Sequence, residues 1–314
     1  MRLPHARQLR QSSLHSTATS FIHKTPRHWS LVIVLTLATL LAAGLSIAQP
    51  SAAASAHGYH AQNDYLALGD SVPFGYSPLV NPADTDQFVG YPTTVARVLG
   101  LRLTNAACPG ATSSYFVSLA GTDWECIPFR THFPLHVNYT TSQLDFAVSF
   151  LRSHPHTRLV TLTIGANDLL RLQSLCGGNV TCIQAGLPAL LATYSANLDT
   201  IYATIRHKAH YHGQIVALTY YSTNYADAVT TGILHTLDET FGQRTRAWGG
   251  TVASGFYAFQ VATAKYNGDS CAAGLLIRVS ATACDIHPSV KGRILLGWTV
   301  VAAARQSDAK HEAA

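Results

Sequence analysis

The sequence predicts an α/β domain in which helices cover both faces of a central parallel sheet, a three-layer α/β/α arrangement. Short apolar runs rich in β-branched residues alternate with longer segments of helical period. These runs do not alternate strictly between apolar and polar residues, which is typical of strands that are buried on both faces. No repeat, charge block or low-complexity linker follows residue 57, so the body of the chain can form one core.

Four runs are expected strands and four longer segments are expected helices. The strands are residues 65–68, 101–105, 159–164 and 215–219. The helices are residues 91–99, 142–153, 183–209 and 290–304. Pro188 predicts a kink or a break in the third helix, because proline lacks the backbone N–H and crowds the preceding turn.

Residues 112–139 are predicted to be a long irregular excursion, because they are rich in aromatic residues and show no period. Such segments are often functional walls or lids. The aromatic residues of this excursion could line a pocket or form local core, and they are Tyr115, Phe116, Trp124, Phe129, Phe133 and Tyr139.

The first 56 residues have the pattern of a secretory leader. They contain five basic residues and no acid, then an apolar run over residues 31–43, and end in Ala54-Ser55-Ala56, a small-residue cleavage site. An uncleaved membrane anchor is the alternative, because the apolar stretch extends to Ala48 and about 20 residues can span a bilayer. Residues 57–314 are the expected folded domain, and in either case we expect it outside the cytoplasm.

The leader also accounts for the net charge of +5. Removing its five basic residues from the total of 21 leaves 16 basic and 16 acidic residues in the body. A neutral body with few charges lacks the clustered basic excess that nucleic acid or an anionic membrane would require. We therefore expect no nucleic-acid partner, and membrane contact only through an uncleaved leader.

All six cysteines lie in the body, which suits an oxidising compartment and therefore secretion. They are Cys108, Cys126, Cys176, Cys182, Cys271 and Cys284. Six cysteines allow 15 pairings, and pairing each cysteine with its neighbour in sequence demands least of the chain path. A zinc site is the alternative, but no C-x-x-C pair is present, and the histidine pairs come without an H-E-x-x-H motif. We expect no metal and no cofactor.

Polar residues follow three of the expected strands, where an open α/β sheet binds its ligands. Gly69-Asp70-Ser71 follows the first strand, residues 105–112 follow the second, and Gly165-Ala166-Asn167-Asp168 follows the third. Asp285 and His287 lie just before the last helix. A serine, a histidine, an acid and amide donors are what acyl transfer needs: nucleophile, base, orienting group and oxyanion donors.

These segments together resemble the SGNH/GDSL hydrolases, a family of secreted and intracellular esterases and lipases, over essentially the whole body. The resemblance implies a flavodoxin-like fold and an acyl-enzyme on Ser71, with His287 as base. It also implies that the amides of Ser71, Gly110 and Asn167 hold the oxyanion. Three sequential cysteine pairs with Cys108-Pro109-Gly110 are similar to the extracellular lipase and esterase branch.

One position departs from the family pattern. The family usually places its aspartate three residues before the histidine, where this sequence has Cys284, and Asp285 stands only two before. Asp285 is the expected acid, with a backbone carbonyl or the more distant Asp269 as alternatives. The α/β-hydrolase fold is disfavoured, because no G-x-S-x-G elbow occurs.

The function predicted from these features is a secreted, monomeric serine esterase or lipase that acts on a small-molecule or lipid ester. A carbohydrate O-acetyl esterase or an acyltransferase would share every catalytic residue and differ only in pocket and acceptor. A catalytically silent carbohydrate- or surface-binding domain is the alternative of another class, since fold alone does not imply function.

Overall fold

The structure is a computed structural model that describes residues 63–312. The predicted leader and its cleavage site lie outside the described residues. Within residues 63–312, no helix combines the length and the apolar character that a membrane span needs.

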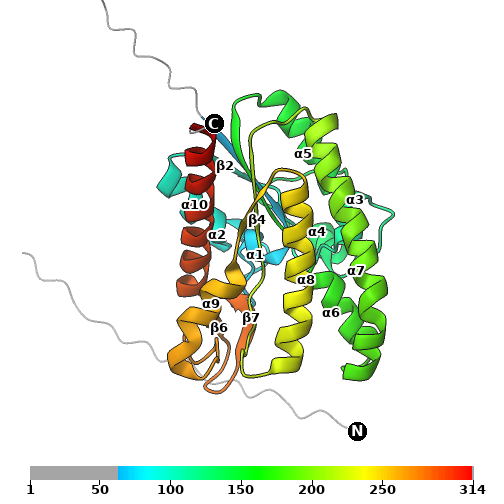
Figure 1. Cartoon of the computed structure of the whole chain (residues 1–314), viewed down its shortest axis with the longest axis vertical. Coiled ribbons are helices and arrows are strands. Elements are labelled where there is room, and N and C mark those ends of the chain that lie inside the picture. The colour runs from blue at the N-terminus through cyan, green and yellow to red at the C-terminus, as the bar shows by residue number, and fades with distance from the viewer. Residues whose placement is uncertain (1–62, 313–314) are drawn as a thin grey trace, which may run out of the picture. The chain divides into compact units, whose positions relative to one another are not determined.

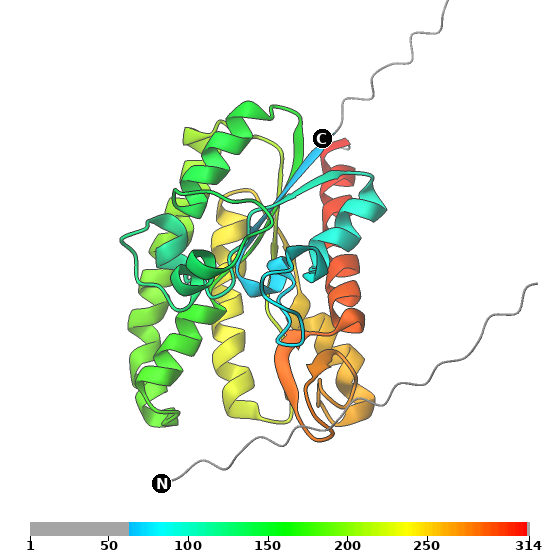
Figure 2. The ribbon, with the colours of Figure 1, turned by 180° about the vertical axis from the view of Figure 1, so that it is seen from behind.

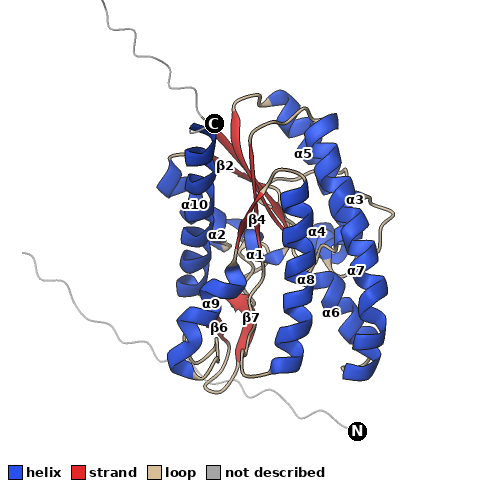
Figure 3. Ribbon diagram, in the orientation of Figure 1, coloured by secondary structure: helices blue, strands red, loops and turns tan. Residues whose placement is uncertain are grey.

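A parallel five-stranded sheet forms the centre of the domain, with the strand order β2-β1-β3-β4-β5 (Figure 3). Its strands are β1 (Asp64–Gly69), β2 (Arg102–Asn105), β3 (Thr157–Thr163), β4 (Gln214–Leu218) and β5 (Thr251–Ala253). The first four are the predicted strands, with small shifts at their ends. The sequence analysis missed β5, because three residues after two glycines are too short to form an apolar run.

Helices cover both faces of the sheet (Figure 1). One face is covered by α5 (Gln143–Ser153), α7 (Val180–Ala203) and α8 (Ala228–Ala247), and the other by α2 (Tyr91–Leu99), α9 (Gly255–Thr263) and α10 (Val290–Glu312). Successive residues of β1 point to opposite faces, so Leu66 and Leu68 join one buried cluster and Tyr65 and Ala67 join the other. The predicted three-layer α/β/α fold is therefore confirmed.

The helix α7 continues through Pro188 without interruption, so the predicted break is absent. Proline removes the hydrogen bond to the carbonyl of Gln184, and both residues are exposed. Water can therefore solvate this carbonyl, which lowers the cost of the missing bond. The helical segment ends as a π-helix, Thr204–Lys208, one residue before the predicted end.

The excursion over residues 112–139 contains two short helices, α3 (Ser113–Val117) and α4 (Cys126–His132), so the prediction of an irregular segment is wrong at these positions. Both helices are too short to show a period in the sequence. Local hydrogen bonds start them: the Thr112 side chain accepts from Tyr115 N–H, and the Asp123 side chain accepts from Ile127 N–H.

Three disulfides pair the cysteines in sequential order, as Cys108–Cys126, Cys176–Cys182 and Cys271–Cys284. The first joins the segment after β2 to the start of α4, and the second joins the end of α6 (Ala166–Leu175) to the start of α7. The third joins Cys271 to the first residue of β7 (Cys284–Pro288), the strand that pairs antiparallel with β6 (Leu276–Arg278).

Candidate active site

The turn after β1 places Ser71 at the carboxyl edge of the sheet, as the first residue of the short helix α1 (Ser71–Phe74). Gly69 has a φ of +132°, and a side chain there would collide with the carbonyl oxygen of Thr163 on β3. The buried Gln143 side chain accepts from Gly69 N–H at 2.6 Å and donates to Gly69 C=O at 2.9 Å. These contacts fix the turn that presents Ser71.

The β6–β7 hairpin carries Asp285 and His287 on neighbouring positions of one strand face. Residues two apart on a strand point to the same side, so the two-residue spacing allows direct contact. His287 Nδ1 lies 2.5 Å from Asp285 Oδ1, and the His287 backbone N–H donates to the same oxygen at 2.9 Å. Asp269 instead accepts from the N–H groups of Cys271 and Ala272, so it is engaged within its own turn.

Ser71 and His287 meet although they are 216 residues apart in sequence, and His287 Nε2 lies 2.8 Å from Ser71 Oγ. Figure 2 shows the segment after β1 and the β6–β7 hairpin side by side. Burial tends to raise the pKa of Asp285, but the hydrogen bonds and charge of His287 outweigh it and lower the pKa. A charged carboxylate can only accept, so Nδ1 carries the hydrogen and Nε2 is left to accept from the Ser71 hydroxyl.

The amide groups named in the sequence analysis lie around Ser71. Gly110 has a φ of +80° and packs tightly against Glu125, because a Cβ at this position would lie 2.4 Å from Glu125 Cβ. Asn167, in the first turn of α6, donates to Ala111 C=O at 3.0 Å and to Asp70 at 3.4 Å. Within the described chain, the N–H groups of Ser71 and Gly110 appear in none of the hydrogen bonds.

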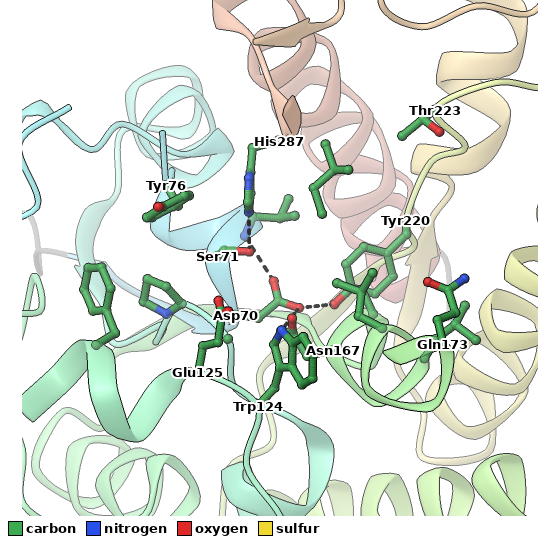
Figure 4. Close-up of a pocket in the computed structure, with 18 of the residues that line it drawn as sticks. Asp70, Ser71, Tyr76, Trp124, Glu125, Asn167, Gln173, Tyr220, Thr223 and His287 are labelled. Atoms are coloured by element: carbon green, nitrogen blue, oxygen red, sulfur yellow. Dashed lines mark hydrogen bonds between the residues drawn. The ribbon is translucent and has the colours of Figure 1, made fainter. Parts of the chain in front are cut away.

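A buried polar network beneath Ser71 was not predicted. Asp70 Oδ1 accepts from Val72 N–H at 3.0 Å, and Asp70 Oδ2 accepts a short hydrogen bond from the Tyr220 hydroxyl (Figure 4). Burial raises the pKa of Asp70 to about 6, against the hydrogen bonds that lower it. Asp238 holds Tyr220 in turn, since its Oδ1 accepts from Tyr220 N–H at 3.0 Å.

Tyr220 could have been found by the rule that located the other site residues, because it follows β4 as Ser71 follows β1. The pairing of Tyr220 with Asp70 across 150 residues leaves no local signal in the sequence.

A cavity of about 600 Å³ opens beside Ser71 and His287, within the size range of small-molecule sites. Figure 4 shows Tyr76 and Glu125 on one side of Ser71, and Gln173 and Thr223 on the other. The cavity wall also includes Leu169, Leu170 and Leu234, so most of it is apolar.

The aromatic residues of the excursion divide between the two predicted roles. Trp124, Phe129 and Phe133 line the cavity, whereas Tyr115 and Phe116 are buried in the core. Tyr139 packs on Phe146 and donates to Ala106 C=O at 2.9 Å. The excursion therefore forms part of the cavity wall and also contributes side chains to the main core on one face of the sheet.

The histidines of the body were considered as metal ligands in the sequence analysis. Among residues 63–312, no group of three His, Cys, Asp or Glu side chains is arranged to hold a metal ion. His136 instead contacts Phe74 C=O at 2.9 Å through Nε2, and His154 stacks on Phe150 with ring centroids 4.0 Å apart.

Comparison with known proteins gives one family match. The model described as the GDSL-like Lipase/Acylhydrolase family matches residues 67–293, a span that includes Ser71, Gly110, Asn167, Asp285 and His287. No curated protein matches the chain.

Several solved structures have a similar fold. The phospholipase A1 from Streptomyces albidoflavus NA297 is 22% identical, with a TM-score of 0.52, and the match covers 77% of this chain and 98% of that one. The extracellular lipase from Streptomyces rimosus is 20% identical, with a TM-score of 0.48, over 78% and 99% of the two chains. The acetylxylan esterase Axe2 from Geobacillus stearothermophilus is 16% identical, with a TM-score of 0.48, over 77% and 94%.

Proposed function

Since the chain belongs to the GDSL-like lipase/acylhydrolase family and is a carboxylic ester hydrolase, we propose that it works through an acyl-enzyme on Ser71. The observation that carries this proposal is the hydrogen-bonded series Ser71–His287–Asp285. Its two links of 2.8 and 2.5 Å lie at the edge of a cavity that can hold a substrate. A nucleophile in contact with a base that a third group orients is the arrangement that acyl transfer requires.

In the proposed reaction, Ser71 Oγ attacks the ester carbonyl carbon while His287 Nε2 takes the hydroxyl proton. The tetrahedral intermediate collapses when the bond to the alcohol oxygen breaks, and His287 returns the proton to that oxygen. Water then attacks the acyl-enzyme, again with His287 as base, and releases the acid and free Ser71. Asp285 holds the imidazole in the required tautomer and stabilises its positive charge.

The negative oxygen of each intermediate would be held by the N–H groups of Ser71 and Gly110 and by the side-chain amide of Asn167. The existing contact from Asn167 to Asp70 is 3.4 Å, near the outer limit for such a bond, so this N–H can turn to a substrate at little cost. Its stronger bond to Ala111 keeps the amide in place meanwhile.

The cavity favours esters with sizeable apolar groups over small sugar acetates. Its volume of about 600 Å³ exceeds what an acetyl group needs, and leucines and aromatic rings form much of its wall. The neutral, charge-poor body argues against a polyanionic substrate. The leader pattern and three disulfides support secretion, as expected from the sequence.

A panel of esters from acetate to palmitate tests the proposal on the purified protein. We expect turnover of the medium-length esters, and loss of nearly all of it in Ser71→Ala, because the nucleophile is absent. Parental turnover by Ser71→Ala would overturn the assignment.

A further inference from the structure

Glu125 brings an unpaired carboxylate into the wall of the active-site cavity. Glu125 immediately precedes α4, but its side chain makes no capping hydrogen bond there. In the described part of the chain, this carboxylate takes part in no ion pair and no side-chain hydrogen bond. Glu125 is exposed, so its side chain faces the solvent as well as the cavity.

The backbone of Glu125 lies close to the proposed oxyanion site. Glu125 N–H donates to Gly110 C=O at 3.3 Å, and its Cβ lies against the Gly110 backbone. Gly110 is the residue whose amide would hold the developing oxyanion. Because the Glu125 side chain also lines the cavity, its negative charge would attract a positively charged part of a bound ester.

Aromatic side chains line the same part of the cavity. Trp124 precedes Glu125 in sequence, Phe129 and Phe133 lie on or just after α4, and the Tyr76 and Phe129 ring centroids are 6.2 Å apart. Aromatic faces attract ammonium groups, and quaternary ammonium ligands are commonly bound by several rings with a carboxylate nearby. No arginine or lysine is among the residues lining this cavity.

The opposite side of Ser71 has a different character. Figure 4 shows the uncharged Gln173 and Thr223 on that side. The helix α6, which carries Gln173, also lines the cavity with Leu169 and Leu170, and α8 does so with Leu234. An ester bound at Ser71 extends its acyl and alcohol portions away from the carbonyl in two directions. The aliphatic side fits an acyl chain, which leaves the side with Glu125 and the aromatic rings for the alcohol.

We infer that Glu125 and the neighbouring aromatic rings select esters whose alcohol portion carries a positive charge, such as a quaternary ammonium group. This inference rests on the proposed function, because it assigns the substrate class to the same site. Glu125 acts here through charge attraction, and Trp124, Tyr76 and Phe129 act through contact with the cationic group.

Two esters of equal shape test the inference, namely butyrylcholine and its carbon isostere 3,3-dimethylbutyl butyrate. They differ in one charge, so the ratio of their kcat/KM values reports charge recognition and cancels the shared chemistry. We expect the protein to favour the choline ester by about 3- to 30-fold, the range of cation–aromatic contacts and a partly exposed ion attraction. Higher ionic strength should lower this preference without affecting the neutral ester.

The variant Glu125→Gln keeps the shape of the side chain and removes its charge. We expect most of the preference to disappear, because kcat/KM for the choline ester falls toward that for the neutral ester. Glu239→Gln is the matched control, because it removes one exposed carboxylate of α8 that does not line the cavity. Its preference should equal that of the parent.

The possible outcomes separate this inference from the proposed function. Equal rates on both esters, or an unchanged ratio in Glu125→Gln, would overturn the inference while hydrolysis of the neutral ester upholds the esterase. If neither ester is hydrolysed, the inference can be tested by measuring how well each alcohol protects Ser71 from labelling by a fluorophosphonate. Choline should slow this labelling more than 3,3-dimethylbutanol does. Equal protection by the two alcohols would also overturn the inference.

Discussion

Ser71 and His287 lie on two scaffolds of different strength. Ser71 follows β1, which pairs with β2 on one side and with β3 on the other. The Gln143 side chain makes two hydrogen bonds to Gly69, in the turn before Ser71. His287 lies on a two-stranded hairpin outside the main sheet. The sheet side is therefore positioned by the core of the domain, whereas the hairpin depends on a few individual contacts.

Two of these contacts can be named. The Cys271–Cys284 disulfide ends at the residue before Asp285, and the Tyr221 hydroxyl donates to Ile286 C=O at 2.9 Å. Tyr221 lies in the segment that follows β4, so this bond links the hairpin to the carboxyl edge of the sheet. Packing of the core therefore positions the nucleophile, whereas a disulfide and a hydrogen bond position the base. Substitutions can remove these two kinds of contact separately.

The largest effect should come from the hairpin side, at the acid. We expect Asp285→Asn to lower kcat/KM by about 10³- to 10⁴-fold, because the imidazole loses both its orientation and the charge that stabilises its protonated form. On the sheet side, Asn167→Ala should cost about 10²- to 10³-fold, since it removes one of three oxyanion donors. Steady-state kinetics on one ester compare the two variants. A smaller loss in Asp285→Asn than in Asn167→Ala would show that a different group orients His287.

The buried Asp70 on the sheet side should make the free energy of unfolding depend on pH. Burial raises the pKa of Asp70 from 3.8 to about 6, so between these values the folded protein holds a proton that the unfolded chain has released. The free energy of unfolding contributed by Asp70 should therefore decrease as the pH rises through this window, by about 3 kcal/mol in total. Urea unfolding of the parent and Asp70→Asn at pH 4 and pH 7 measures the difference. If the difference in unfolding free energy between the two proteins were the same at pH 4 and pH 7, the raised pKa of Asp70 would be contradicted.

The smallest effect should follow removal of the hairpin disulfide. We expect replacement of Cys271 and Cys284 by alanine to lower kcat about tenfold, because small displacements of a catalytic group are costly to the rate. Removal of Cys176 and Cys182 is the matched control, since that disulfide links α6 to α7 and its cysteines do not line the cavity. The rate of ester hydrolysis by each folded double variant provides the test. Equal rates in both would mean that the hairpin holds its position without the disulfide.

Much of the fold followed from the sequence, because long apolar runs and helical periods are local signals. The strand β5 and the helices α3 and α4 did not, since elements this short carry too few residues to show a period. At Pro188 a kink or a break was predicted and the helix does not break, because the exposed position lets water replace the lost bond.

The predicted site residues lie together in the structure because each follows a strand end or precedes the last helix. Tyr220 and Asp238 were missed, since their link to Asp70 exists only in the folded chain. Glu125 was missed as well, because its place beside Gly110 depends on the path of the excursion and the Cys108–Cys126 disulfide.

Covalent labelling with a fluorophosphonate tests most directly whether Ser71 is a nucleophile that His287 activates. Mass spectrometry of the labelled protein should show one adduct, on the peptide that contains Ser71. The rate of labelling should fall sharply in His287→Ala, and Ser71→Ala should take up no label. An adduct on another residue, or undiminished labelling of Ser71→Ala, would contradict the account.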